Sequence, residues 1–342
     1  MITAIDFGCD TIRSAFRSME NRREISLFSE RAQYTVLPNT AAHLHALADN
    51  HISYATCEDN LVVFGNQAAG VRWLSKTPSA PLFTDGQIPR EDAPARQILS
   101  ILTRALLPAV DSVGYCFYTG PAGDGEQQNN EFLSRLIRMH GWIPIAGSAG
   151  NAVILASGSE QRFTGISVIV GAESTRIAVA RFGQELSTET LNVGSNWIDG
   201  ELATQHDIKT WAPSGDCYLD LEAVRDWKHN PSLDLRTAGN ERERTLGRLY
   251  DVVLGRIARS IREQLSSATV RSVLPDERLT VACAGGAALV GGFVPSLTDR
   301  LVEHDIAGRI TTVRVVDDAE TCVVRGLMIQ GELEQLTATR AA

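Results

Sequence analysis

The sequence contains no long apolar segment, few cysteines and no excess of basic residues. No run approaches the roughly 18 apolar residues of a membrane span, and Asp6 interrupts the N-terminus before a signal-peptide core could form. The formal net charge of −9 provides nothing that would recruit nucleic acid or an anionic membrane surface. We therefore expect a cytoplasmic protein with no transmembrane segment and no nucleic-acid partner.

The six cysteines are scattered along the chain. They form no CxxC pair and have no histidine cluster beside them, which argues against a zinc site and against a disulfide framework. We expect them to be buried thiols.

The remaining composition is that of a compact globular protein, with 44% hydrophobic and 21% charged residues. A chain of 342 residues is long enough for two domains, at about 100 to 200 residues per domain. The order of apolar and polar segments supports two related lobes. Residues 2–16 read as a strand, a polar glycine-containing turn and a second strand, and the same pattern restarts at residues 165–182.

Strand, loop and helix patterns follow each of these hairpins, which predicts layered α/β architecture. Helical spacing predicts helices over 66–73, 93–107, 126–140 and 242–266. Two other stretches lack long periodic segments. We expect short strands and connections over 17–53 and a polar, irregular insert over 204–240.

The first turn, Asp6 to Arg13, has the residue types that a phosphate site needs. A tight turn offers backbone N–H donors, a glycine permits close approach, and a carboxylate can hold Mg²⁺ through water. A polar β-turn without any ligand would have the same composition. The turn alone therefore leaves both interpretations open.

A second glycine-rich segment, Ala284 to Gly292, follows a buried strand and opens a helix. Its small residues would let an adenosine or a phosphate approach the backbone near a helix N-terminus. The spacing is not the G-x-G-x-x-G of a dinucleotide-binding fold. A glycine-rich packing turn is the alternative.

Taken in order, these segments resemble the superfamily of actin, the heat-shock chaperone ATPase domains and the bacterial MreB-like proteins. Asp6 to Arg13 resembles the first phosphate loop, and Gly171 to Thr175 lies where the second belongs. Gly194 to Asp199 resembles the motif that follows the second loop, and Ala284 to Gly292 resembles the adenosine loop. Asp317 to Gly326 resembles the second interdomain connection, with its closest likeness to MreB.

The resemblance implies an α/β, actin-like ATPase fold of two duplicated ribonuclease-H-like lobes with ATP or ADP and Mg²⁺ in a central cleft. The first lobe would comprise 1–150 plus 311–342, with a small insert over about 18–60, and the second 151–310, with an insert over about 204–241. Asp6 would hold Mg²⁺ through water, with Asp199 and Asp10 as further candidates. The matched nucleotide-binding positions are Asp6, Gly8, Cys9, Asp10, Thr11, Arg13, Gly171, Ala172, Gly194, Gly285, Gly286 and Ala287.

Two departures from the family pattern affect the chemistry. Ile169 stands where the second loop of the family has an aspartate, and Ala172 and Glu173 replace glycines. Asn151 stands where chaperones and MreB have a glutamate. General-base catalysis needs a group within reach of the attacking water. We therefore expect weak or absent ATP hydrolysis, unless Glu173 has become the replacement catalytic acid.

Three functions fit this resemblance. One is an MreB-like cytoskeletal or scaffold protein whose nucleotide state controls self-association into filaments. Another is a chaperone-like regulatory nucleotide-binding domain that acts as a monomer. The third is a pseudo-ATPase that serves as a non-polymerising interaction module, which the replacements Ile169, Glu173 and Asn151 favour.

Overall fold

The computed structural model forms two compact units. One comprises Met1–Ala146 with Trp211–Tyr218, and the other Gly147–Thr210 with Leu219–Ala342. The structure describes residues 1–17, 24–75, 78–109, 114–212 and 215–341.

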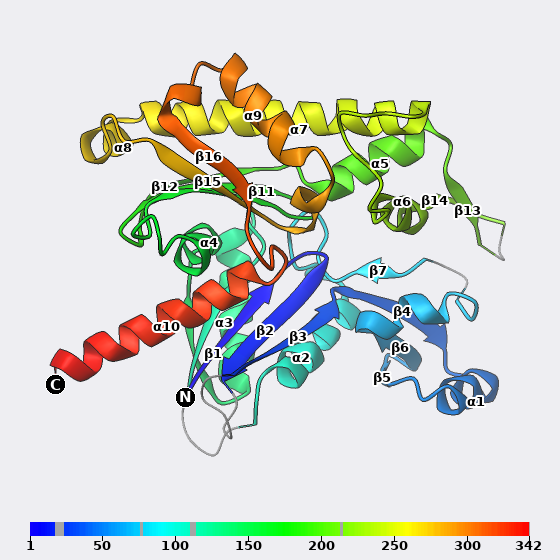
Figure 1. Ribbon diagram of the computed structural model, residues 1–342. Helices are drawn as coiled ribbons and strands as arrows, with labels where there is room; N and C mark the ends of the chain where they lie inside the picture. Colours follow the sequence, from blue (N-terminus) through cyan, green and yellow to red (C-terminus); the bar gives the residue numbers. More distant parts are fainter. Residues whose placement is uncertain (18–23, 76–77, 110–113, 213–214, 342) are drawn as a thin grey trace. The chain divides into compact units, whose positions relative to one another are not determined.

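The first unit contains a five-stranded sheet in the order β3-β2-β1-β8-β9, of which Figure 1 labels β1, β2 and β3. β1 pairs antiparallel with β2 and parallel with β8, as a hairpin followed by a crossover requires. Helices α2 and α3 supply apolar residues to the core that covers one face of this sheet. The bounds are β1 Ile2–Phe7, β2 Thr11–Arg17, β3 Ile25–Arg31, β8 Gly114–Thr119, β9 Trp142–Ala146, α2 Ala93–Leu106 and α3 Glu126–Met139.

A smaller sheet in the order β5-β6-β4-β7 also lies in the first unit. The sequence predicted an insert over about 18–60. β3 falls within that range but belongs to the main sheet, so the smaller sheet begins only at β4. Residues 18–23 lie outside the described part of the chain. Its elements are β4 Gln33–Pro38, α1 Ala41–Asp49, β5 Tyr54–Cys57, β6 Asn60–Phe64 and β7 Ala80–Pro81.

Two local predictions in this region were wrong. α1 was not predicted, although Thr40 caps it by accepting the amide of His43. The helix predicted over 66–73 is instead a pair of 3₁₀ turns, η1 Gly65–Gln67 and η2 Ala69–Val71. Gly65, which directly precedes the predicted span, has a φ of +66°, and two successive 3₁₀ turns follow in place of an α-helix.

The second unit repeats the architecture of the first. Its sheet has the order β12-β11-β10-β15-β16, which matches β3-β2-β1-β8-β9 strand for strand. The duplication predicted from the two hairpins is therefore present in the fold. The strands are β10 Gly165–Val170, β11 Thr175–Arg181, β12 Gln184–Leu191, β15 Leu279–Ala284 and β16 Ile310–Val315.

Helices cover both faces of this second sheet (Figure 1). The long helix α7 packs its apolar stripe onto one face, together with α5 and α9. α4 lies on the other face, so close that a Cβ on Gly150 would be 2.4 Å from that of Ala178. The helices and 3₁₀ turns of this unit are α4 Ala149–Ser157, α5 Ser195–Gln205, α6 Leu221–Lys228, α7 Glu241–Ser266, α8 Ala268–Val273, η3 Gly286–Leu289, α9 Phe293–Glu303, η4 Ala307–Arg309 and α10 Cys322–Ala341. The strands β13 Lys209–Trp211 and β14 Cys217–Leu219 bound Trp211–Tyr218, the segment that groups with the first unit.

The C-terminal segment groups with the second unit by its contacts, whereas the sequence-based division placed 311–342 in the first lobe. β16 pairs parallel with β15, which makes it an edge strand of the second sheet. α10 packs on α4, where a Cβ on Gly326 would lie 1.8 Å from the carbonyl oxygen of Ala152. The division into two lobes with those bounds remains a prediction.

The cysteines are free thiols, but only three of them are buried as expected. Burial raises the pKa of Cys283 and of Cys322 to about 12, and it also raises the pKa of Cys116. Cys9 and Cys57 are partly exposed and Cys217 is exposed. Within the described residues, no helix is long and apolar enough to cross a membrane.

Candidate functional site

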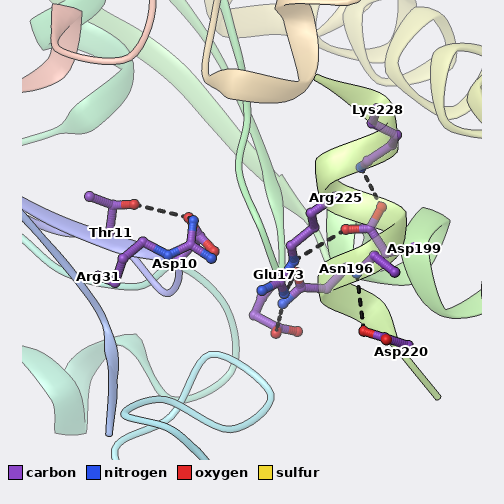
Figure 2. Close-up of polar contacts among 10 residues, drawn as sticks. Asp10, Thr11, Arg31, Glu173, Asn196, Asp199, Asp220, Arg225 and Lys228 are labelled. Carbon is purple, nitrogen blue, oxygen red and sulfur yellow. Dashed lines mark hydrogen bonds and ion pairs between the residues drawn. The ribbon is translucent and has the colours of Figure 1, made fainter. Parts of the chain in front are cut away.

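The first candidate loop is the turn between β1 and β2. A Cβ on Gly8 would lie 2.6 Å from the carbonyl oxygen of Thr11, so the tightness of the turn requires glycine. The carboxylate of Asp10 accepts hydrogen bonds from the Thr11 hydroxyl and from Arg31 Nη1, both at 2.9 Å on Oδ2 (Figure 2). The acid of this turn is therefore held by its neighbours.

Asp6 and Arg13 flank the same turn as cross-strand partners. Partners in a sheet project to the same face, so the acid and the cation predicted to serve phosphate and Mg²⁺ are neighbours. Both are partly exposed, as is Cys9. The hairpin thus brings together all the site residues predicted in the first loop.

The second candidate loop, Gly171 to Ser174, occupies the equivalent place in the second sheet. Asp6 pairs with Arg13 and Thr119, while Ile169 pairs with Arg176 and Ala284. Residues 8–11 and 171–174 close the two hairpins with turns of equal length. By register, Ile169 takes the place of Asp6, and Glu173 takes the place of Asp10.

The backbone of the second loop is bonded to the start of α5. The carbonyl oxygens of Gly171 and Ala172 accept the amides of Ser195 at 2.9 Å and Asn196 at 2.8 Å. A Cβ on Gly194 would lie 2.3 Å from the Ala172 oxygen. Gly194 was predicted to bind nucleotide. In the fold, the absence of a side chain at Gly194 allows the second loop to approach the start of α5.

Two backbone amides of the second loop, unlike its carbonyl oxygens, make no hydrogen bond among the described residues. Gly171 donates its N–H to Ser174 at 3.0 Å, but the N–H groups of Ala172 and Glu173 donate to no acceptor among the described residues. Consecutive amides of this kind in a turn form an anion-binding concavity. The loop therefore has a donor set that fits a phosphate.

The side chain of Glu173 is also anchored to α5. Its Oε1 accepts a hydrogen bond from Asn196 Nδ2 at 2.5 Å, and Asn196 Oδ1 accepts one from Arg225 Nη2 at 2.8 Å (Figure 2). Arg225 lies on α6, within the insert that was expected to be irregular. A continuous polar chain thus connects α6 to the second loop.

Asp199 is the buried partner of this chain. Its side chain is 1% exposed and is ion-paired with Lys228 and, at 3.5 Å, with Arg225 Nε. Burial raises the pKa of Asp199, and the two cations, Lys228 first, oppose that rise. Asp199 was a candidate ligand for Mg²⁺. In the fold, its carboxylate is paired with Lys228 and Arg225.

Sequence reasoning missed Asn196, Arg225 and Lys228. The available signal was spacing: Asn196 and Asp199 are three residues apart, as are Arg225 and Lys228, so each pair shares one helix face. Because α6 was not predicted, the second pair was not recognised.

The third candidate loop follows β15. Gly285 has a φ of +91°, and a Cβ there would lie 2.3 Å from the carbonyl oxygen of Val170. Because β10 and β15 are parallel neighbours, the second and third loops lie at the same end of the sheet. The Tyr250 hydroxyl on α7 donates to the carbonyl oxygen of Ala287 at 3.2 Å, and Gly286 directly precedes Ala287.

Asn151, which was predicted to stand in place of the glutamate of chaperones and MreB, lies in the first turn of α4. Its amide N–H donates to Ser148 Oγ at 3.3 Å, which caps the helix. Its side-chain Oδ1 is buried and accepts no hydrogen bond from any described residue. An amide oxygen in this state can accept a hydrogen bond from water, but it is a far weaker base than a carboxylate.

The described residues contain no group of three or more His, Cys, Asp or Glu side chains that could hold a metal by themselves.

Comparison with known proteins identifies the family. A family model described as Volactin matches residues 1–330. The chain belongs to the Volactin family. No match was found among curated proteins.

Solved structures show that this Volactin-family chain has an actin-like, MreB-like fold, as predicted. It resembles MreB 5 of Spiroplasma citri bound to AMPPNP, with a TM-score of 0.69, 13% identity, and coverage of 100% of this chain and 98% of that one. It resembles a MamK double helical filament, with a TM-score of 0.68, 15% identity and coverage of 97% and 98%. A third relative, the ethanolamine utilization protein EutJ of Carboxydothermus hydrogenoformans, has a TM-score of 0.53, 16% identity and coverage of 96% and 88%.

Substituting the third loop tests its geometry in this Volactin-family chain. Gly285→Ala should lower the free energy of unfolding by about 1–3 kcal/mol, because the new Cβ meets a backbone oxygen at a positive φ. Urea denaturation measures the change. Gly255→Ala is the matched control: it lies within α7 with open space around it and should stabilise by about 0.5–1 kcal/mol. A Gly285→Ala variant as stable as the parent would contradict the tight approach.

Proposed function

We propose that this chain binds ATP or ADP with Mg²⁺ and acts as an actin-like cytoskeletal or scaffold protein in the cytoplasm, with weak or absent hydrolysis. The observation that carries the proposal is the repeated sheet: each copy closes its first hairpin with a tight glycine-containing turn in the same register. In the second copy, the amides of Ala172 and Glu173 are unpaired within the described part of the chain.

This proposal assigns a role to each of the candidate loops. Asp6 holds Mg²⁺ through water, and Arg13 faces the phosphates beside it. Backbone amides of both turns contact the phosphates, and the loop from Gly285 to Ala287 takes the adenosine. The MreB 5 structures, solved with AMPPNP and with ADP, support a nucleotide in a fold of this kind.

Hydrolysis should be slow because the groups that activate water are replaced. A water attacking the γ-phosphate must be oriented and must lose a proton. Ile169 can do neither, and Asn151 can orient a water without taking its proton. Loss of general-base assistance alone costs about a hundredfold to ten-thousandfold in rate. Nucleotide binding can survive this loss.

Self-association is supported by the likeness to the MamK double helical filament. Head-to-tail contact of identical protomers produces an open filament when the rotation does not close. The second candidate is a non-polymerising pseudo-ATPase module, or a chaperone-like regulatory domain, and the apolar Ile169 at the place of Asp6 favours it.

One experiment separates these functions. Purified protein is sedimented with Mg²⁺ and ATP, with Mg²⁺ and ADP, and without nucleotide, and phosphate release is followed in the same samples. We expect pelleting that depends on nucleotide and phosphate release far slower than that of ordinary actin-like ATPases. No pelleting at any protein concentration would favour the monomeric candidates. Rapid release abolished by Glu173→Ala would make Glu173 the catalytic residue.

A further inference from the structure

The polar chain from α6 to the second loop has a fixed direction. Arg225 can only donate, so Asn196 must turn its oxygen toward Arg225 and its NH₂ group toward Glu173. The result is a charge-assisted relay from a guanidinium through an amide to a carboxylate. The amide orientation of Asn196 thus follows from its partner on α6.

The relay leaves half of the Glu173 carboxylate available. Oε1 is engaged by Asn196, whereas no described residue donates to Oε2. Glu173 is also the only acid in the second turn, and Ile169 removes the one expected from the family. The neighbouring unpaired amides place this carboxylate beside the donor set that fits a phosphate.

The relay is rigidly supported. The carbonyl oxygens of Gly171 and Ala172 hold the start of α5, and Asp199 on α5 is ion-paired with Lys228 and Arg225 on α6. The second loop, α5 and α6 therefore form one connected unit. A change in the position of α6 would change where Glu173 points.

We propose that Asn196 and Arg225 position Glu173 so that it binds the water shell of a nucleotide-bound divalent cation, which gives α6 control over the affinity for Mg²⁺ and ATP. The inference rests on the proposed nucleotide site. Glu173 is the group that contacts the hydrated cation, while Asn196 and Arg225 act through it.

The sign of the Glu173 charge effect depends on the cation. With Mg²⁺ present, the carboxylate accepts hydrogen bonds from metal-bound water and strengthens ATP binding. Without Mg²⁺, the same carboxylate repels the phosphates. Glu173→Gln should therefore weaken ATP binding by about tenfold with Mg²⁺ and strengthen it in EDTA, a reversal that simple loss of structure cannot produce.

A double-mutant cycle tests the positioning role. ATP affinity is measured by calorimetry with Mg²⁺ and with EDTA for the parent, Arg225→Gln, Glu173→Gln and the double variant. Arg225→Gln should weaken Mg²⁺-dependent binding severalfold in the parent and have no effect in the Glu173→Gln background. Asn196→Ala should reproduce the loss while leaving the ion pair of Asp199 and Lys228 intact.

Arg236→Gln is the matched control, because Arg236 is an exposed arginine of the same unit that pairs with Asp299 at 3.7 Å. Equal losses from Arg225→Gln in both backgrounds, or no reversal with Glu173→Gln, would overturn the positioning role. Failure of the parent to bind ATP or ADP under any condition would instead remove the proposed function and the inference with it.

Discussion

Replacing Lys228 by methionine should lower the free energy of unfolding by about 3–5 kcal/mol at pH 7, because it leaves a buried carboxylate without its nearer cation. The Asp199 side chain is 1% exposed and that of Lys228 only 13% exposed, so water cannot replace the lost partner. Arg225 remains, but its Nε lies 3.5 Å from Asp199.

The loss should depend on pH in a defined direction. Burial already raises the pKa of Asp199 above 3.8. Lys228 and Arg225 both lower this pKa, and the effect of Lys228 is the larger. Without Lys228 the folded-state pKa rises further. A raised folded-state pKa means that the folded protein binds the proton more tightly, so stability falls as pH rises through the interval above 3.8. The deficit of Lys228→Met should therefore be smaller at pH 5 than at pH 7.

Urea denaturation at both pH values measures this effect. Lys209→Met is the matched control, because Lys209 and its partner Asp207 are 44% and 80% exposed. An exposed pair contributes about 0–1 kcal/mol. Adding Asp199→Asn to Lys228→Met should recover part of the loss, since it removes the buried charge. A loss no larger than that of Lys209→Met would show that Asp199 is not an unpaired charge in the variant.

Asp6→Ala should reduce Mg²⁺-dependent ATP affinity by about ten- to hundredfold, as removal of an outer-shell carboxylate does at other metal sites. Asp6 is the acid near the end of β1 that the register places next to Arg13, and its counterpart in the second sheet is the apolar Ile169. The site therefore has no second acid at the equivalent place to compensate.

Calorimetric titration with ATP, in Mg²⁺ and then in EDTA, measures the effect of Asp6→Ala. The loss should be confined to the Mg²⁺ condition, because the phosphates keep their amide donors. Asp49→Ala, at an exposed acid of α1, is the control and should leave the affinity unchanged. Equal affinity of Asp6→Ala and the parent in Mg²⁺ would argue against Asp6 as the metal-site acid.

Much of the fold could be predicted because its signals are local. Alternation of apolar residues sets a strand, and a turn as tight as that at Gly8 requires glycine, so both hairpins and their repetition were visible in the sequence. The long helix α7 was equally visible from its apolar stripe. The helix predicted over 66–73 was wrong because helical spacing over so short a segment does not distinguish an α-helix from successive 3₁₀ turns.

The sequence by itself therefore determined the two duplicated sheets, the turns that close them and the apolar character of Ile169. Only the tertiary structure determined which residues α6 contacts. Arg225 is close to Asn196 only because α5 and α6 pack side by side, and Asp199 is buried only because of the same packing. Hydrogen bonds and ion pairs depend on distances of a few ångströms between residues far apart in sequence, and residue spacing along one helix does not specify the partner on another.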